Sequence, residues 1–206
     1  MNWLQIISAL IVLVGAIIFV VGVINILVST QRRHYNSELA PRKGSPVRGV
    51  LWAFTLGMAP WAKESARIHW VAYIRGIVLH LSIFVGAVFL LVTPWLTLIP
   101  EWIHLSLAAL FAAGAILGLA GFYMRISEKT LRILSTPDDY FSLALTTLFL
   151  ASAAATAYNL KYLPAFWIIS GIALSYAPLG KLRHFIYFVY TRIFLGSVFG
   201  RRSVLE

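Results

Sequence analysis

The chain has 206 residues, of which 60% are hydrophobic and only 12% are charged. A soluble domain is typically about half apolar and about a quarter charged, so this composition excludes an ordinary soluble fold and indicates a membrane protein. There is no cysteine, which excludes disulfides, Cys-type zinc sites and iron–sulfur clusters ligated by this chain. The formal net charge is +10, and its meaning depends on where the charges fall.

Five stretches of the chain are suited to crossing a membrane. A spanning helix needs about 20 mostly apolar residues to cross about 30 Å of hydrocarbon. The stretches lie at about residues 4–28, 71–95, 102–124, 140–160 and 163–190. The fourth is rich in Ala, Ser and Thr and is the least hydrophobic. We predict an all-α integral membrane bundle of five transmembrane helices, forming one domain over residues 1–206.

Basic residues alternate with these stretches. Residues 29–68 form a basic loop, a second group follows the third stretch, a third group follows the fifth, and only Lys161 falls in a loop on the opposite side. Lys and Arg concentrate on the cytoplasmic side of membrane proteins. We therefore predict an outer N-terminus and a cytoplasmic C-terminus, in the inner (cytoplasmic) membrane. Apolar spans interrupt the basic residues, which argues against a nucleic-acid partner.

The basic loop also contains an apolar stretch, Val50–Trp61, among several prolines. We expect this stretch to lie at the membrane interface or to form a short re-entrant piece. Attraction of the basic segments to anionic membrane lipid is one role for them, and docking of a cytoplasmic protein is another.

The third stretch carries Gly114-x-x-x-Gly118 followed by Gly121, and Gly86 lies in the second. Small residues at this spacing let two helix backbones approach closely. Helix packing is the plainer interpretation, and a flat face that admits a planar cofactor is the alternative.

Ionisable groups inside a membrane are costly and usually functional. No Asp or Glu lies inside a predicted span, which weighs against a proton-coupled transporter. No Ser–His–Asp set, paired carboxylates or H-E-x-x-H motif is present, which weighs against a hydrolase. Histidines are the remaining candidates for chemistry. His34 is expected to be solvated, and His104 is expected to be an interfacial anchor.

Two histidines are matched in predicted depth. A b-type haem in a helical bundle needs two neutral imidazoles from facing helices. His80 lies inside the second stretch and His184 near the cytoplasmic end of the fifth, so this pair is the predicted set of axial ligands, with His69 as the reserve ligand. A histidine hydrogen-bonded to a neighbouring helix is the structural alternative. Candidate partners for haem propionates are Arg75, Lys181 and Arg183, although ordinary positive-inside flanking would also place them there.

Three segments carry a resemblance to a known family. They are Arg75-Gly-Ile-Val-Leu-His80, the entry Thr136-Pro-Asp-Asp-Tyr-Phe-Ser142, and Pro178-Leu-Gly-Lys-Leu-Arg-His184. Together they resemble membrane cytochromes b of the respiratory nitrate reductase gamma-subunit type, in the branch associated with heterodisulfide-reductase-like and sulfite-reduction complexes. The likeness covers roughly residues 67–199, and the last segment is the most specific.

The resemblance implies haem ligation at His80 and His184, a nearby quinone site for menaquinone or ubiquinone, and a cytoplasmic iron–sulfur or flavin subunit as partner. Diheme members carry a further histidine in the region that reads Ala165-Phe-Trp-Ile-Ile here. We therefore expect a single haem b. With no cysteine in the chain, any iron–sulfur cluster belongs to a partner.

The sequence thus predicts an electron-transfer subunit of a quinone-linked oxidoreductase complex. A haem-free membrane anchor of such a complex is the first alternative. A transporter or channel is the second, although no repeated halves are present to favour it.

Overall fold

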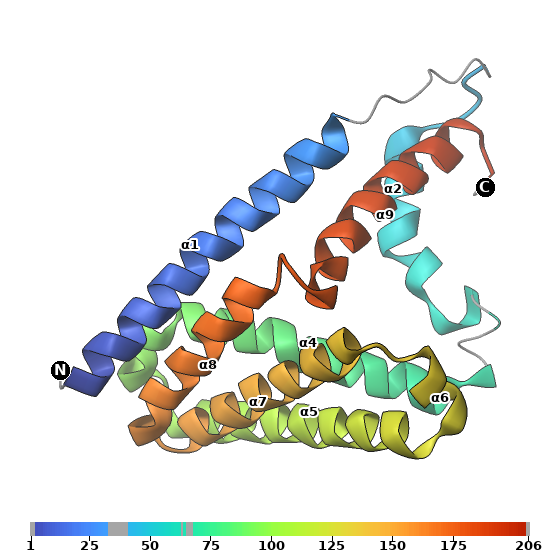
Figure 1. Cartoon of the computed structure of the whole chain (residues 1–206). Helices are drawn as coiled ribbons and strands as arrows, with labels where there is room; N and C mark the ends of the chain where they lie inside the picture. The colour runs from blue at the N-terminus through green and yellow to red at the C-terminus, as the bar shows by residue number, and fades with distance from the viewer. Residues whose placement is uncertain (1–2, 33–40, 63, 65–67, 205–206) are drawn as a thin grey trace. The chain divides into compact units, whose positions relative to one another are not determined.

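The computed structural model of the chain describes residues 3–32, 41–62, 64 and 68–204. Every regular element in these ranges is helical (Figure 1), so the predicted all-α class is confirmed. Four of the described helices are long and apolar enough to cross a membrane, and Leu160–Tyr176 with Lys181–Arg201 adds a fifth if the broken pair is one span. Length and composition therefore indicate a multi-pass membrane protein.

The long helices are α1 (Trp3–Gln31), α4 (Trp70–Leu91), α5 (Glu101–Ser127) and α7 (Pro137–Tyr158). The shorter helices are α2 (Pro46–Phe54), α6 (Lys129–Leu134), α8 (Leu163–Tyr176) and α9 (His184–Arg201). The 3-10 segments are η1 (Leu56–Met58), η2 (Pro60–Ala62), η3 (Thr93–Leu98), η4 (Leu160–Tyr162) and η5 (Lys181–Arg183). These elements form two compact units. The first unit is Met1–Gly22 with Arg75–Leu182, and the second is Val23–Ile74 with Arg183–Glu206.

Two predicted helices end earlier than expected. The stretch 71–95 is helical only to Leu91, because Pro94 cannot donate a backbone hydrogen bond and the chain turns into η3. The stretch 163–190 is two helices rather than one, since α8 ends at Tyr176 and α9 begins at His184. Pro178 lacks the N–H that would continue α8, and the N–H groups of Leu179 and Gly180 turn back to the Tyr176 carbonyl at 2.9 and 3.0 Å.

The core of the first unit is aromatic. Phe89 of α4, Phe111 of α5, Phe149 of α7 and Phe166 of α8 are all buried. Phe89 lies 5.3 Å from Phe111 and 5.6 Å from Phe166, measured between ring centroids. Tilted ring pairs at these distances are favourable beyond the area they bury. This cluster joins four helices that are separated along the chain.

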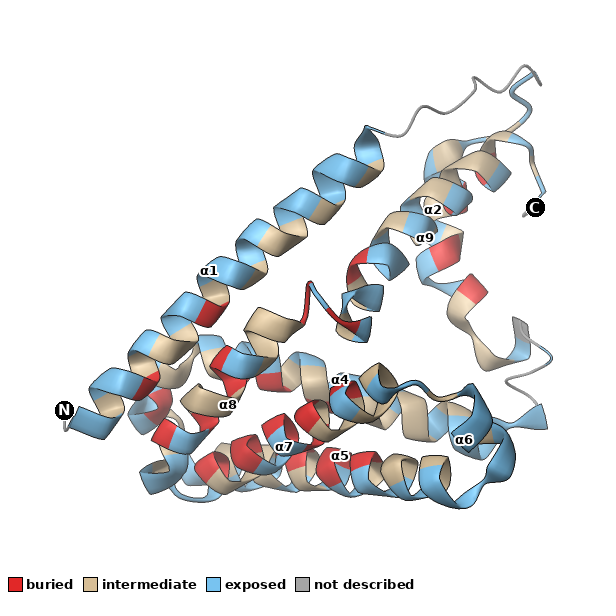
Figure 2. Ribbon diagram, in the orientation of Figure 1, coloured by how far each residue is buried: buried red, intermediate tan, exposed pale blue. Residues whose placement is uncertain are grey.

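Helix α7 is the central helix of the first unit. Over half of its span is buried, against about a fifth or less in the other three long helices. Figure 2 shows the buried residues concentrated on α5, α7 and α8, whereas α1 is largely exposed. A helix surrounded by other helices does not face lipid, so small and hydroxyl residues can replace large apolar ones there. This accounts for the low hydrophobicity of the fourth predicted stretch.

Side-chain contacts fix the helix directions in the first unit. Gly114 faces Leu150 and Gly118 faces Thr147, so α5 and α7 are antiparallel. Ser142 contacts Tyr176, and Phe149 contacts Phe166, so α7 and α8 are antiparallel. As a result, five of the six Lys and Arg residues of this unit lie at one end, which we call the basic end: Arg75, Arg125, Lys129, Arg132 and Lys181.

Helices α1 and α8 run parallel and touch through small residues. A Cβ on Gly171 would lie 2.6 Å from the carbonyl oxygen of Ile11, and a Cβ on Gly15 would overlap the Gly171 backbone. Seven residues later, Gly22 lies against Pro178 in the same way. Ser8, seven residues before Gly15, is fully buried. A seven-residue repeat keeps one seam facing a neighbouring helix, so this seam sets the approach of α1 to α8.

The second unit is built on a close pairing of α2 with α9. Gly49 packs against the backbone of Gly196 and Gly200, a G-x-x-x-G pair that lets the helices approach closely. The N–H groups of Lys43 and Gly44 donate to the carbonyl of Arg201 at 2.8 and 3.0 Å, which satisfies the C-terminal end of α9. The predicted interfacial stretch Val50–Trp61 thus comprises the end of α2 and two 3-10 turns.

Candidate functional site

His80 lies in the middle of α4, and its Nδ1 is 2.7 Å from the carbonyl oxygen of Gly76. A carbonyl oxygen only accepts, so Nδ1 carries the proton of this hydrogen bond. Metal-ligating histidines almost always donate their second ring N–H to a carbonyl, carboxylate or water. The side chain of His80 is exposed, and its Nδ1–H is directed at the backbone of α4.

His184 is the first residue of α9 and is exposed. It belongs to the second unit, whereas His80 belongs to the first. The predicted axial pair therefore combines one ligand from each unit, and it stays a prediction.

The other histidines are accounted for locally where they are described. His69 directly precedes α4, is exposed, and accepts the Tyr73 N–H at 3.0 Å through its carbonyl. His104 lies in the first turn of α5, and its Nε2 is 2.9 Å from the Leu96 carbonyl. His34 lies outside the described residues, as do Arg33, Lys63 and Arg67 of the basic loop.

The predicted propionate partners differ in their surroundings. The guanidinium of Arg75 donates to the sulfur of Met124 at the end of α5. The ammonium of Lys181 donates to the carboxylate of Asp139. Arg183 is exposed at the end of η5. Arg75 and Lys181 both lie at the basic end of the first unit. Along α4, Arg75 is about one and a half helical turns, or about 7.5 Å, from His80.

Asp139 holds this end of the first unit together. Its Oδ2 accepts the backbone N–H and the hydroxyl of Thr136 at 2.8 and 2.9 Å, which caps the start of α7. The same oxygen accepts from Lys181, and Oδ1 lies 3.9 Å from Arg125. One carboxylate thus joins α5, α7 and the segment after α8. We call this set the Asp139 clamp: Thr136, Asp139, Arg125 and Lys181.

The residues after Asp139 hold the end of α8. The Ser142 hydroxyl is 3.1 Å from the Tyr176 hydroxyl, and the Phe141 ring meets the Tyr176 ring edge-on at 4.7 Å. A Cβ on Gly180 would overlap the Tyr176 ring. Gly180 is therefore required for the turn to fold back onto Tyr176. Together with the clamp, these contacts fix the chain up to Leu182, two residues before His184.

The sequence singled out the segments that contain Asp139 and Lys181, but it did not predict the contact between them. Asp139 and Lys181 are 42 residues apart, and a local pattern does not show which distant groups will pair. One local signal was present. Thr136 followed three residues later by an acidic residue at the start of an apolar run is typical of a helix N-cap.

The glycine face of α5 is filled by protein. A Cβ on Gly114 would lie 2.6 Å from the Ser82 Cβ, and Gly118 lies directly against Thr147. Gly86 lies against the Phe149 ring, where a Cβ would be 2.8 Å from its edge. These glycines serve helix packing, and the alternative of a planar cofactor on this face has no space.

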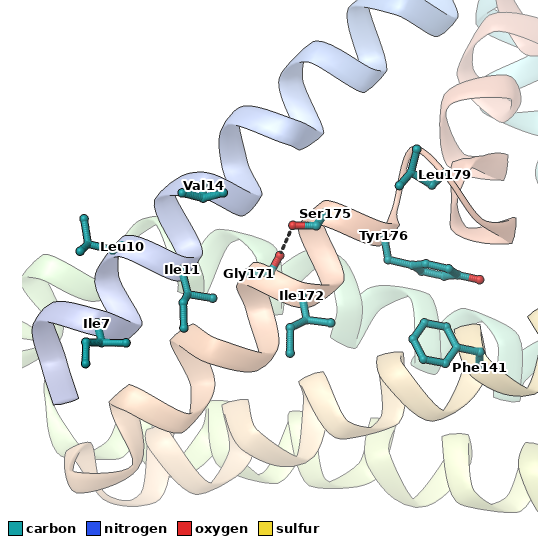
Figure 3. Close-up of a pocket in the computed structure, with 10 residues that line it drawn as sticks. All are labelled: Ile7, Leu10, Ile11, Val14, Phe141, Gly171, Ile172, Ser175, Tyr176 and Leu179. Atoms are coloured by element: carbon teal, nitrogen blue, oxygen red, sulfur yellow. Dashed lines mark hydrogen bonds between the residues drawn. The ribbon is translucent and has the colours of Figure 1, made fainter.

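An open apolar groove of about 610 Å³ runs along α1 and α8 (Figure 3). Its walls are hydrocarbon for most of their length, from residues that include Ile7, Leu10 and Ile172. The Ser175 hydroxyl is turned to the Gly171 carbonyl at 2.8 Å. The Phe141 and Tyr176 rings also line the groove, and the Tyr176 hydroxyl is hydrogen-bonded to the Ser142 hydroxyl.

Substitution of Asp139 tests the clamp. Asp139→Asn is expected to lower the free energy of unfolding by about 1–2 kcal/mol, because it weakens the N-cap and removes the charge that pairs with Lys181. Thermal unfolding in detergent, followed by tryptophan fluorescence, measures the change. Asp138→Asn removes the same charge from the same helical turn and is the control. Equal effects of the two substitutions would show that the clamp has no specific role.

Within the described residues, no group of three or more His, Cys, Asp or Glu is placed to hold a metal ion. The predicted haem site uses two histidines and is not of that kind. Comparisons of the chain with protein-family models, with curated proteins and with solved structures found no match.

Proposed function

We propose that this chain is a haem b-containing membrane subunit of a respiratory redox complex. It passes electrons between the quinone pool and a cytoplasmic iron–sulfur or flavin partner. The observation that carries the proposal is His80, a histidine in the middle of an apolar helix whose Nδ1–H is fixed by the Gly76 carbonyl. An imidazole at this position is costly in hydrocarbon unless it has a role.

His80 and His184 are the proposed axial ligands of one haem b. Arg75 and Lys181 lie toward the basic end, where anionic propionates find cations, and Arg183 follows in the chain. When bound, haem supplies one-electron transfer at its iron. The chain would contribute two ligands, of which His80 is oriented by the Gly76 carbonyl.

We place the protein in the inner (cytoplasmic) membrane, with the basic end of the first unit on the cytoplasmic side. The support is the excess of Lys and Arg at that end, with Lys161 alone at the other. Helices α1 and α8 are parallel to each other, and both are antiparallel to α7. This orientation therefore puts the N-terminus outside. The basic loop 29–68 and the C-terminal tail then face the cytoplasm, where an acidic iron–sulfur or flavin subunit would dock.

The groove along α1 and α8 supports a quinone as the membrane-side reactant. Its hydrocarbon walls suit the prenyl tail of menaquinone or ubiquinone. A haem-free anchor remains the alternative function. The position of His80 in the middle of an apolar helix favours the haem-binding protein over that anchor.

Reduction by quinol tests the proposed function. The chain, purified in mild detergent with its native partners, is mixed with a short-chain menaquinol or ubiquinol analogue and its visible spectrum is followed. We expect the b-type α-band to appear on quinol addition and to fade on oxidation of the cytoplasmic partner. Haem that dithionite reduces but neither quinol reduces would contradict the proposed electron path.

A further inference from the structure

The exposed face of α2 is apolar. Val47, Leu51 and Phe54 are 66%, 61% and 40% exposed, and their spacing of four and three residues places them on one stripe of the helix. The opposite stripe, Gly49 and Ala53, is buried; Gly49 packs against α9. Helix α2 has nine residues, which is about 13 Å of helix and far too short to cross a membrane.

Basic residues gather at the start of this helix. The backbone bonds from Lys43 and Gly44 to Arg201 bring the start of α2 and the end of α9 together. That contact gathers cations from two distant parts of the chain: Arg42, Lys43, Arg48, Arg201 and Arg202. In the described part of the second unit, Glu64 is the one acidic residue. The Nε–H of Arg201 is buried, with no acceptor among the described residues.

We propose that α2 and the end of α9 form a docking surface for anionic phospholipid. Val47, Leu51 and Phe54 enter the acyl boundary, and the surrounding cations bind headgroup phosphates. A short helix with an apolar stripe and basic flanks is the pattern of an interfacial helix. The charge is complementary to an anionic leaflet.

This surface does not depend on haem or quinone. If lipid covers α2, a cytoplasmic subunit would dock on the rest of the basic loop. A protein partner fits this stripe less well than lipid does, because the long apolar helices already hold the chain at the bilayer.

Depth measurement on α2 tests the proposal. The chain has no cysteine, so Leu51→Cys carries one nitroxide label. Ser45→Cys, at the exposed N-cap residue beside the basic start of the same helix, is the matched control. The full chain is reconstituted in vesicles of phosphatidylcholine with phosphatidylglycerol. We expect the Leu51 label to collide several-fold more with oxygen than with a water-soluble nickel chelate, and the Ser45 label to show the reverse order.

The charge requirement is tested in the same assay. In vesicles of phosphatidylcholine alone, we expect the Leu51 label to become more accessible to the nickel chelate. Raising the salt concentration with anionic vesicles should have the same effect. Replacement of the five basic residues by Gln should do the same. Nickel access to Leu51 in anionic vesicles would overturn the proposal, as would protection that ignores lipid charge and salt. Protection that appears only when the native cytoplasmic subunit is added would assign the stripe to that protein instead.

Discussion

Replacing His80 by alanine is expected to abolish haem binding, and His184→Ala is expected to do the same. Each substitution removes one axial imidazole, and a b-type haem in a helical bundle is held by little else than its two ligands and packing. Loss of the α-band in the reduced spectrum, with haem quantified as the pyridine haemochrome, measures the effect. The unaltered chain should retain about one haem under the same conditions.

Two other histidines serve as controls for that experiment. His104→Ala removes a ring that already bonds the Leu96 carbonyl, and His69→Ala removes an exposed ring eleven residues before His80. Both variants should keep the haem. Loss of haem in His69→Ala together with retention in His80→Ala would instead make His69 the ligand and move the haem outward along α4.

Gly171→Ala is expected to destabilise the first unit by about 1–3 kcal/mol, the usual cost of forcing extra atoms into a packed contact. The new Cβ would lie 2.6 Å from the Ile11 carbonyl oxygen. The carbonyl oxygen belongs to the backbone of α1, and the Cβ is attached directly to the backbone of α8. Relieving the overlap therefore requires α1 and α8 to separate. Thermal unfolding in detergent, followed by circular dichroism, measures the change.

Gly121→Ala is the matched control for that substitution. It is also a glycine inside an apolar helix, and its Cβ would meet the Leu143 side chain at an ordinary 3.6 Å. Because alanine favours helix by about 1 kcal/mol over glycine, Gly121→Ala should be neutral or stabilising. If Gly171→Ala behaved like Gly121→Ala, the α1–α8 seam would not be a close backbone contact.

Because of the break between α8 and α9, the last predicted span is not one continuous helix. Helix α8 has 14 residues, or about 21 Å, which is less than the about 30 Å of a hydrocarbon core. The turn at Ala177–Gly180 is accordingly held by side chains, with Ser142 and Phe141 on Tyr176. Non-helical backbone at membrane depth is tolerated where protein covers it.

Hydropathy predicted the long helices well, because a backbone in lipid must satisfy its hydrogen bonds within the helix. Their ends were less predictable. Pro178 was visible in the sequence, but the apolar run on both sides of it concealed the break. Contacts between distant segments were not predictable at all. Asp139 with Lys181, and Gly49 with Gly196, pair residues whose proximity depends on the assembled helices.

The candidate site divides in the same way. The choice of His80 followed from an ionisable residue in an apolar stretch, and the structure adds its hydrogen bond to the Gly76 carbonyl. Lys181 was chosen as a propionate partner, which stays a prediction, and its contact with Asp139 was missed. The glycines of α5 were correctly interpreted as packing residues, because Ser82 and Thr147 occupy the space beside them.

Haem content tests the central claim most directly. The chain is purified with its native partners in mild detergent, and oxidised and dithionite-reduced spectra are recorded with a pyridine haemochrome assay. The account predicts a b-type spectrum with about one haem per chain. Protein with its partners intact and no haem would contradict it and would leave a membrane anchor as the function.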